Sequence, residues 1–122
     1  WMKKLPKLSR NEDFATVRRR GTSWADRDIV LIASPRVDGN IELSSRCGFV
    51  VSRRVGNAVV RNRCKRRMRE SAKSFNISDG HDIVFIAREN LSRATFGRIQ
   101  DSMSALLLSA GLVVEKDIHE EN

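Results

Sequence analysis

Residues 47–75 read CGFVVSRRVGNAVVRNRCKRRMRESAKSF and contain two different patterns. Residues 46–52 form a short run with Phe49, Val50 and Val51 at its centre, which predicts a strand. Gly56 then interrupts the run, and Asn57 is of a residue type that caps helix N-termini. From there to about Phe75, apolar side chains recur at helical spacing, which predicts a helix. A strand followed at once by a helix is therefore the central unit of the predicted fold.

The predicted helix has one narrow apolar side and is basic over most of the rest. The apolar side consists of Val60, Cys64, Met68 and Ala72, with Phe75 close to it. Such a stripe faces a protein core. Solvated helix faces usually alternate acids and bases four residues apart, because like charges at that spacing repel each other. Here Lys65 has Arg61 and Arg69 at that spacing. The basic side therefore lacks internal compensation, which favours an external polyanion.

The positive charge of the chain is concentrated in one quarter of its length. The sequence has 23 Lys and Arg against 15 Asp and Glu, a net charge of +8. Residues 46–73 contain ten basic residues and one acidic residue, whereas the other 94 residues contain 13 basic and 14 acidic ones. The single acid, Glu70, can pair with Arg66 or Arg67. Eight of the ten basic residues are Arg, which binds phosphates bidentately and stacks on nucleobases. This favours RNA over a membrane surface as the partner.

The remaining sequence predicts a sheet covered by helices. The expected elements are helices at 10–20 and 93–110, strands at 22–25, 28–34 and 82–87, and turns at 38–40 and 78–80. Ser9 and Glu12 fit a capping box at the first helix, and Gly21 and Gly111 are placed to end the two helices. The last helix has an apolar side made of Phe96, Ile99, Met103, Leu106, Leu107 and Ala110. The order α-β-β-β-α-β-α predicts an α+β fold, a two-layer α-β sandwich whose four strands are apolar on both faces.

The chain of 122 residues is long enough for one domain and too short for two. We expect that domain to cover 1–122, with flexible ends at 1–7 and 115–122. No apolar run approaches the ~18 residues of a membrane span, and the start lacks the apolar stretch of a secretory signal. Cys47 and Cys64 lie in apolar patterns, which predicts buried, reduced thiols and a cytoplasmic location.

No catalytic motif stands out among the residues. Glycine loops of the Walker or Rossmann kind are absent, Ser52 has no histidine base nearby, and the two histidines lack metal-ligand spacing. The carboxylate pairs Glu12–Asp13 and Asp79/Asp82 could serve a metal-dependent nuclease, but both occupy positions where helix starts and turns favour acids. The residues thus predict an RNA-binding protein without a catalytic or metal site. A general RNA-binding or ribosome-associated module would satisfy them as well.

Residues 49–70 closely resemble the signature of the bacterial ribonuclease P protein subunit. The triplet Arg61-Asn62-Arg63, followed by Lys65-Arg66, is the hallmark of that family. Matching stretches at 11–14, 21–23 and 82–88 extend the resemblance over about residues 8–110. The resemblance implies a left-handed β-α-β crossover that carries the basic helix. It also implies a ribonucleoprotein that removes the 5′ leader of precursor tRNA, in which the RNA subunit performs magnesium-dependent hydrolysis and the protein binds no cofactor.

The resemblance also implies two sets of RNA-binding residues, with the catalytic RNA subunit and precursor tRNA as partners and no protein partner required. The expected contacts to the RNA subunit are Arg61, Asn62, Arg63, Lys65, Arg66, Arg67 and Arg69. The expected leader cleft between the sheet and the first helix contains Phe14, Arg18, Val30, Ile32, Arg53, Arg54 and Arg88. Arg18 and Ile32 stand where the family often has aromatic residues, so leader recognition here should depend more on charge. Phe14 could equally be a core residue.

Overall fold

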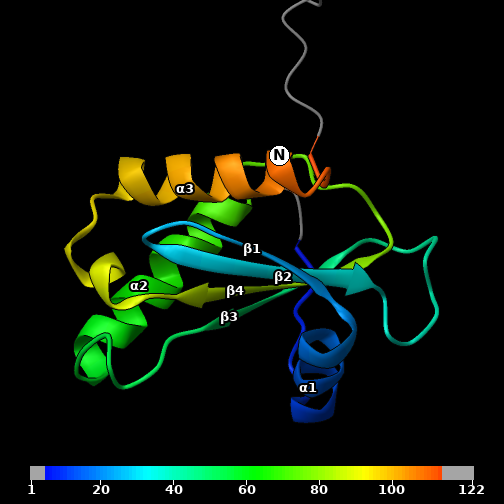
Figure 1. The fold of residues 1–122 in the computed structure, drawn as a ribbon, viewed down its shortest axis with the longest axis horizontal. Helices are drawn as coiled ribbons and strands as arrows, with labels where there is room; N and C mark the ends of the chain where they lie inside the picture. Colours follow the sequence, from blue (N-terminus) through cyan, green and yellow to red (C-terminus); the bar gives the residue numbers. More distant parts are fainter. Residues whose placement is uncertain (1–4, 114–122) are drawn as a thin grey trace, which may run out of the picture.

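The computed structural model describes residues 5–113 and has the predicted order of elements (Figure 1). These are α1 (Asn11–Arg20), β1 (Thr22–Ala25), β2 (Ile29–Pro35), β3 (Arg46–Val50), α2 (Ala58–Ala72), β4 (His81–Ala87), the short 3-10 helix η1 (Glu89–Arg93) and α3 (Phe96–Ser109). The α+β class and the α-β-β-β-α-β-α order are confirmed. No helix in this part of the chain is long and apolar enough to cross a membrane.

The four strands form one mixed sheet in the order β1-β2-β4-β3. The pairs β1/β2 and β2/β4 are antiparallel, whereas β3 and β4 are parallel. Parallel neighbours cannot be joined by a tight turn, so the chain crosses over between them through α2. This is the crossover that the resemblance implies, and its left-handed sense remains an expectation from that resemblance.

Helices cover both faces of the sheet. In Figure 1, α3 lies on one side of the strands and α1 on the other. Strand β4 shows the alternation: Phe85 belongs to the core under α2 and α3, and its neighbour Val84 belongs to a smaller cluster with Val17 of α1. The sheet is therefore apolar and covered on both faces, as predicted, with α1 on the face opposite α2 and α3.

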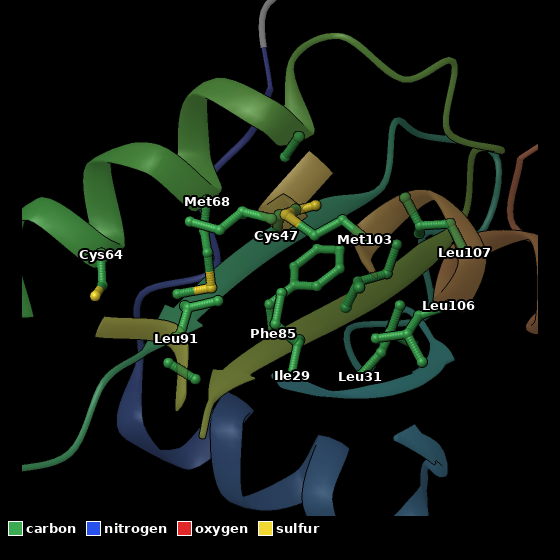
Figure 2. Packing of buried hydrophobic residues seen from close by; sticks show 14 of the residues in the cluster. Ile29, Leu31, Cys47, Cys64, Met68, Phe85, Leu91, Met103, Leu106 and Leu107 are labelled. Carbon is green, nitrogen blue, oxygen red and sulfur yellow. The ribbon is translucent and has the colours of Figure 1, made fainter. Parts of the chain in front are cut away.

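The larger core is centred on Phe85, which Figure 2 shows among side chains of the sheet and of α2 and α3. The Phe85 ring stacks on Phe49 of β3, with 5.7 Å between the ring centroids. Helix α2 contributes its predicted apolar stripe, including the fully buried Met68. Cys47 and Cys64 are free and buried, as predicted. Burial raises the pKa of both thiols, to about 12 for Cys47.

The predicted helix caps are partly confirmed. Asn57 caps α2, because its side-chain oxygen accepts a hydrogen bond from the backbone N–H of Val60 at 3.0 Å. The capping box on α1 is wrong: the N-cap residue is Arg10, which makes no capping bond, and its side chain pairs with Glu12. The physical reason is that the preceding Leu8 is buried and hydrogen-bonded to β3, which commits this segment to the sheet.

Gly21 ends α1 for a different reason from the one expected. Its φ is −77°, so it does not adopt the left-handed conformation of a glycine stop. A Cβ at this position would lie 2.5 Å from the carbonyl oxygen of Val17 and 2.7 Å from a methyl carbon of Ile32. Close packing of the helix end on β2 therefore requires glycine. Gly111, by contrast, has a φ of +72° and ends α3 as predicted.

The last helix begins later than expected. Residues 89–93 form η1, and α3 starts at Phe96 after Thr95, whose hydroxyl oxygen accepts a hydrogen bond from the Arg98 N–H. Phe96 is 41% exposed, so its expected place on the packed side is wrong, whereas Ile99 and Met103 are fully buried. As the first residue after the cap, Phe96 projects beyond the end of the core.

The N-terminal segment is held on the sheet. The Cys47 N–H donates to the carbonyl of Pro6, and the Leu8 N–H donates to the carbonyl of Cys47, each at 3.0 Å. Pro6 and Lys7, for which a flexible end is expected, thus lie along the outer edge of β3. Residues 1–4 and 115–122, for which flexibility is also expected, fall outside the described residues.

A buried ion pair joins the starts of β3 and β4. The fully buried Asp82 accepts two hydrogen bonds from Arg46, each at 2.7 Å, and a third from the backbone N–H of Val37. The sequence suggested that Asp82 is a turn residue, which is therefore wrong. Its hydrogen bonds to Arg46 raise the pKa of that guanidinium above its ordinary value. Arg46 thus belongs to the fold, although it contributes to the basic stretch of the sequence.

Replacing Arg46 with Ala should strongly destabilise the fold, because it leaves the Asp82 carboxylate buried without a counter-charge. We expect a loss of about 3–5 kcal/mol in the free energy of unfolding, measured by urea denaturation. The control R20A removes an exposed cation from α1 and should change the free energy by less than about 0.5 kcal/mol. Equal stability of the two variants would contradict the structural role of Arg46.

Candidate nucleic-acid interface

The outward side of α2 carries the predicted contacts to an RNA subunit. We call this side the basic face of α2, and it consists of Arg61, Asn62, Arg63, Lys65, Arg66, Arg67 and Arg69. Asn62, Arg66 and Arg69 are exposed, and the other four residues are half-buried. The apolar stripe on the opposite side of the helix is anchored in the core by Met68. Burial of the stripe therefore turns the charges of α2 outward.

Two arginines of the basic face also hold the fold together. An Arg63 guanidinium nitrogen donates to the carbonyl oxygen of Ser92 at 3.3 Å, and one of Arg67 donates to that of Ala94 at 3.2 Å. Both carbonyls lie at the end of η1. An arginine has five N–H donors, so these single bonds leave others for a ligand.

The basic face has less internal neutralisation than the sequence suggested. Glu70 was expected to pair with Arg66 or Arg67, but it pairs with Lys73 at 3.2 Å. Within the described residues, Arg66 has no hydrogen-bonding or ionic partner. Its exposed guanidinium is therefore free to bind a phosphate.

A groove lies between α1 and the end of β3. This α1 groove has a volume of about 440 Å³ and is lined by Asn11, Phe14, Ala15, Arg18, Phe49, Val50, Val51 and Lys65. It brings together Phe14 and Arg18, two of the predicted leader residues, and Lys65 of the basic face. Gly48 allows this arrangement, because a Cβ there would lie 2.5 Å from the Phe14 ring.

Two other predicted leader residues lie on β2. Val30 and Ile32 are half-buried and pair with Ile86 and Val84 of β4. Ile32 packs with the cluster that contains Val17 of α1. Neither Val30 nor Ile32 lines the α1 groove.

The remaining predicted residues are divided by the structure. Arg54 and Arg88 meet in a second hollow of about 450 Å³, which we call the arginine hollow. Its lining is Arg27, Ser52, Arg54, Ala87, Arg88, Glu89 and Asn90. Arg88 also donates to the carbonyl of Asp26 at 3.0 Å. Arg53 is exposed and lines neither hollow. Arg27 was missed by the sequence analysis, because it stands alone between two strands.

A third and larger hollow lies at the outer edge of β3. This β3-edge pocket has a volume of about 600 Å³ and is lined by Leu5, Lys7, Leu8, Ser9, Phe14, Cys47, Gly48, Phe49, Lys65, Arg69 and Lys73. Lys7, Phe49 and Lys73 were not among the predicted site residues. Lys65, Arg69 and Lys73 are spaced four residues apart, so helical geometry could have predicted that they lie on one line. The proximity of Lys7 to them depends instead on the pairing of its segment with β3.

Three of the four carboxylates considered for a nuclease lie beside an arginine. Asp82 is paired with Arg46, Glu12 is paired with Arg10, and Asp13 lies 3.8 Å from Arg46. Within residues 5–113, no three His, Cys, Asp or Glu side chains are gathered in a way that could hold a metal ion.

Comparison with known proteins gives consistent matches over most of the chain. The family model described as "Ribonuclease P" matches residues 2–111. The ribonuclease P protein component of Roseiflexus castenholzii is 41% identical over 115 residues, covering 92% of this chain and 91% of the relative. That of Alkaliphilus metalliredigens is 39% identical over 109 residues, covering 88% of this chain and 95% of the relative.

A solved structure agrees with these matches. The fold is similar to that of the ribonuclease P protein of Staphylococcus aureus, with a TM-score of 0.78 and 32% identity, covering 91% of this chain and all of the other. The basic face of α2, the grooves beside it and these similarities have one common explanation. The chain belongs to the family of bacterial ribonuclease P protein components, which are parts of a tRNA-processing ribonucleoprotein endoribonuclease.

Proposed function

We propose that this protein binds the catalytic RNA subunit through the basic face of α2 and the 5′ leader of precursor tRNA through the α1 groove. The observation that carries the proposal is the position of Lys65, which belongs to the basic face and also lines the α1 groove. A protein with this arrangement can hold two RNA segments side by side. The reducing cytoplasm, which its free thiols favour, would be the site of this assembly.

Binding of the RNA subunit would depend on phosphate neutralisation by the basic face. Arg66 and Arg69 are exposed, and the one acid of α2, Glu70, is paired with Lys73. Cations that bind phosphates release condensed counterions, so affinity should fall steeply as salt rises. Arg63 and Arg67 would add contacts from positions already fixed by η1.

The leader would enter the α1 groove as single-stranded RNA. Unpaired bases stack on aromatic rings, and their phosphates require cations nearby. The α1 groove supplies the Phe14 ring with Arg18 and Lys65. Beyond the end of β3, where Val51 lines the α1 groove and Ser52 lines the arginine hollow, Arg54 and Arg88 would meet further phosphates. Val30, Ile32 and Arg53 would contact the leader from the adjacent sheet and loop surfaces.

The hydrolysis itself would take place on the RNA subunit, where magnesium ions activate water and stabilise the developing charge. The residues of this protein bind and orient the substrate. By holding the leader next to the RNA subunit, they would reduce the entropic cost of bringing the two RNAs together in the reactive arrangement. Their positive charge would also reduce the repulsion between the two RNAs, so less magnesium would be needed.

The proposal is tested by reconstitution from a bacterial ribonuclease P RNA and this protein, with no other protein added. We expect the protein alone to leave precursor tRNA uncut. Added to the RNA at a magnesium concentration too low for the RNA alone, it should restore release of the leader. Cleavage by nuclease-free protein alone, lost on changing Asp79, would instead support the nuclease alternative; Asp82 is unsuitable for this test because its buried pair with Arg46 stabilises the fold. Unchanged cleavage together with binding to ribosomal RNA would support a general RNA-binding module.

Replacing Arg66 with Ala should weaken binding to the RNA subunit and reduce its salt dependence. Loss of one phosphate contact lowers the slope of log affinity against log salt by about 0.7–0.9. The measurement is a binding titration at several salt concentrations. The control R20A removes an exposed cation from α1 and should leave the slope unchanged. If both variants have the wild-type slope, Arg66 is only solvated.

Replacing Phe14 with Leu should weaken the binding of precursor tRNA to the reconstituted enzyme by about 1 kcal/mol, since stacking of a base on an aromatic ring contributes ~1–3 kcal/mol. Affinity for tRNA without a leader should not change. The matched control is F96L, in which the exposed ring on α3 is removed. Equal losses for both RNAs, together with a lower denaturation midpoint, would show that Phe14 is a core residue only.

A further inference from the structure

We propose that the β3-edge pocket binds one unstacked nucleotide of the RNA subunit, with its base against the aromatic rings and its phosphates on the surrounding cations. This inference rests on the proposed function, and it adds a base-binding site to a surface so far described only by its charge. The pocket volume, about 600 Å³, lies within the range of about 300–1,000 Å³ that is usual for small-ligand sites.

The floor of the pocket is an open strand edge. One edge of β3 pairs with β4, and the other pairs with the N-terminal segment only at Cys47. Outward-pointing backbone groups recur at every second residue of a strand, so the N–H and C=O groups of Phe49 point to the same side as those of Cys47. No segment among residues 5–113 pairs with Phe49 on that side. A donor and an acceptor are thus available next to each other, as the edge of a nucleobase requires.

Aromatic rings line the pocket beside this edge. Phe14 lies over Gly48, where a side chain would collide with its ring. Phe49 is only half-buried, although it stacks on Phe85 of the core, and the stack holds its ring in a fixed orientation. The central guanidinium carbon of Arg69 lies 5.8 Å from the centroid of the Phe49 ring. Rings and guanidinium planes are the groups on which proteins stack unpaired bases.

The charge of the pocket suits a phosphate backbone. Its lining residues include four cations, Lys7, Lys65, Arg69 and Lys73, and no acid. Lys73 is paired with Glu70 outside the lining, and the other three make no ion pair within the described residues. A mixed aromatic and cationic lining of this kind favours a nucleotide over an apolar peptide or a simple anion.

The position of the pocket favours the RNA subunit over the leader as the source of that nucleotide. Of the four cations, Lys65 and Arg69 belong to the basic face of α2, and Lys73 is the C-cap residue of that helix. An RNA bound to this face would pass directly over the pocket. The α1 groove shares Phe14, Phe49 and Lys65 with the pocket, but its lining does not include Lys7, Arg69 or Lys73.

The test uses the variant F49L, which keeps an apolar side chain in the core and removes the ring. Its matched control is F96L on α3. The RNA subunit is probed with base-modifying reagents, nucleotide by nucleotide, in the absence of precursor tRNA. We expect the wild-type protein and F96L to protect the base of one unpaired nucleotide. We expect F49L to lose this protection, to keep the rest of the footprint, and to bind the RNA about five- to tenfold more weakly.

Three results would overturn the inference: equal protection by F49L and wild type, protection of no unpaired base by the wild type, or an effect of F49L only when precursor tRNA is present. The last would assign the pocket to the leader. If thermal melting shows that F49L is unfolded, the exposed variant K7A replaces it, with R20A as its control. K7A should then expose the protected base, and R20A should not. Failure of the proposed function is distinguishable, because the wild-type protein would then not bind the RNA subunit at all.

Discussion

The parallel pairing of β3 and β4 is the constraint on which the rest of the structure depends. Because the two strands run in the same direction, the chain must cross the sheet between them, and α2 is that crossing. The apolar stripe of α2 is then buried, and its charges can only face outward. The outward charges lie beside β3 because β3 is an edge strand. The basic character of this surface is therefore a consequence of strand pairing.

The buried ion pair between Arg46 and Asp82 lies at the start of this parallel pair. It aligns the two strands at Arg46↔Asp82, and every later pair, including Phe49↔Phe85, follows from that alignment. The stacked rings in turn place Phe49 at the rim of the α1 groove and of the β3-edge pocket. A charge contact at one end of the sheet thus determines the position of an aromatic ring at the rim of both hollows.

Local patterns in the sequence predicted the helices and strands well. They could not predict the contacts between segments that are distant in the chain. Asn57 and the stripe around Met68 specify α2 by themselves, and the concentration of arginine specifies its basic face. By contrast, Ser9 does not cap α1, because burial of Leu8 against β3 prevails over a local capping preference. The pockets combine residues from segments far apart in the chain, such as Lys7 and Lys73, whose proximity depends on the completed sheet. The roles of glycines at 21 and 48 likewise depend on which side chains approach them.

The two buried thiols have a consequence for studying the motions of this protein. Thiol reagents attack the thiolate, and burial raises the pKa of both cysteines. Labelling in the native state is therefore limited by how often each site opens to solvent. Cys47 lies in the edge strand and Cys64 in the crossing helix, so each reports the opening of a different element. The labelling rates of the two thiols would therefore report separately on the local unfolding of β3 and of α2.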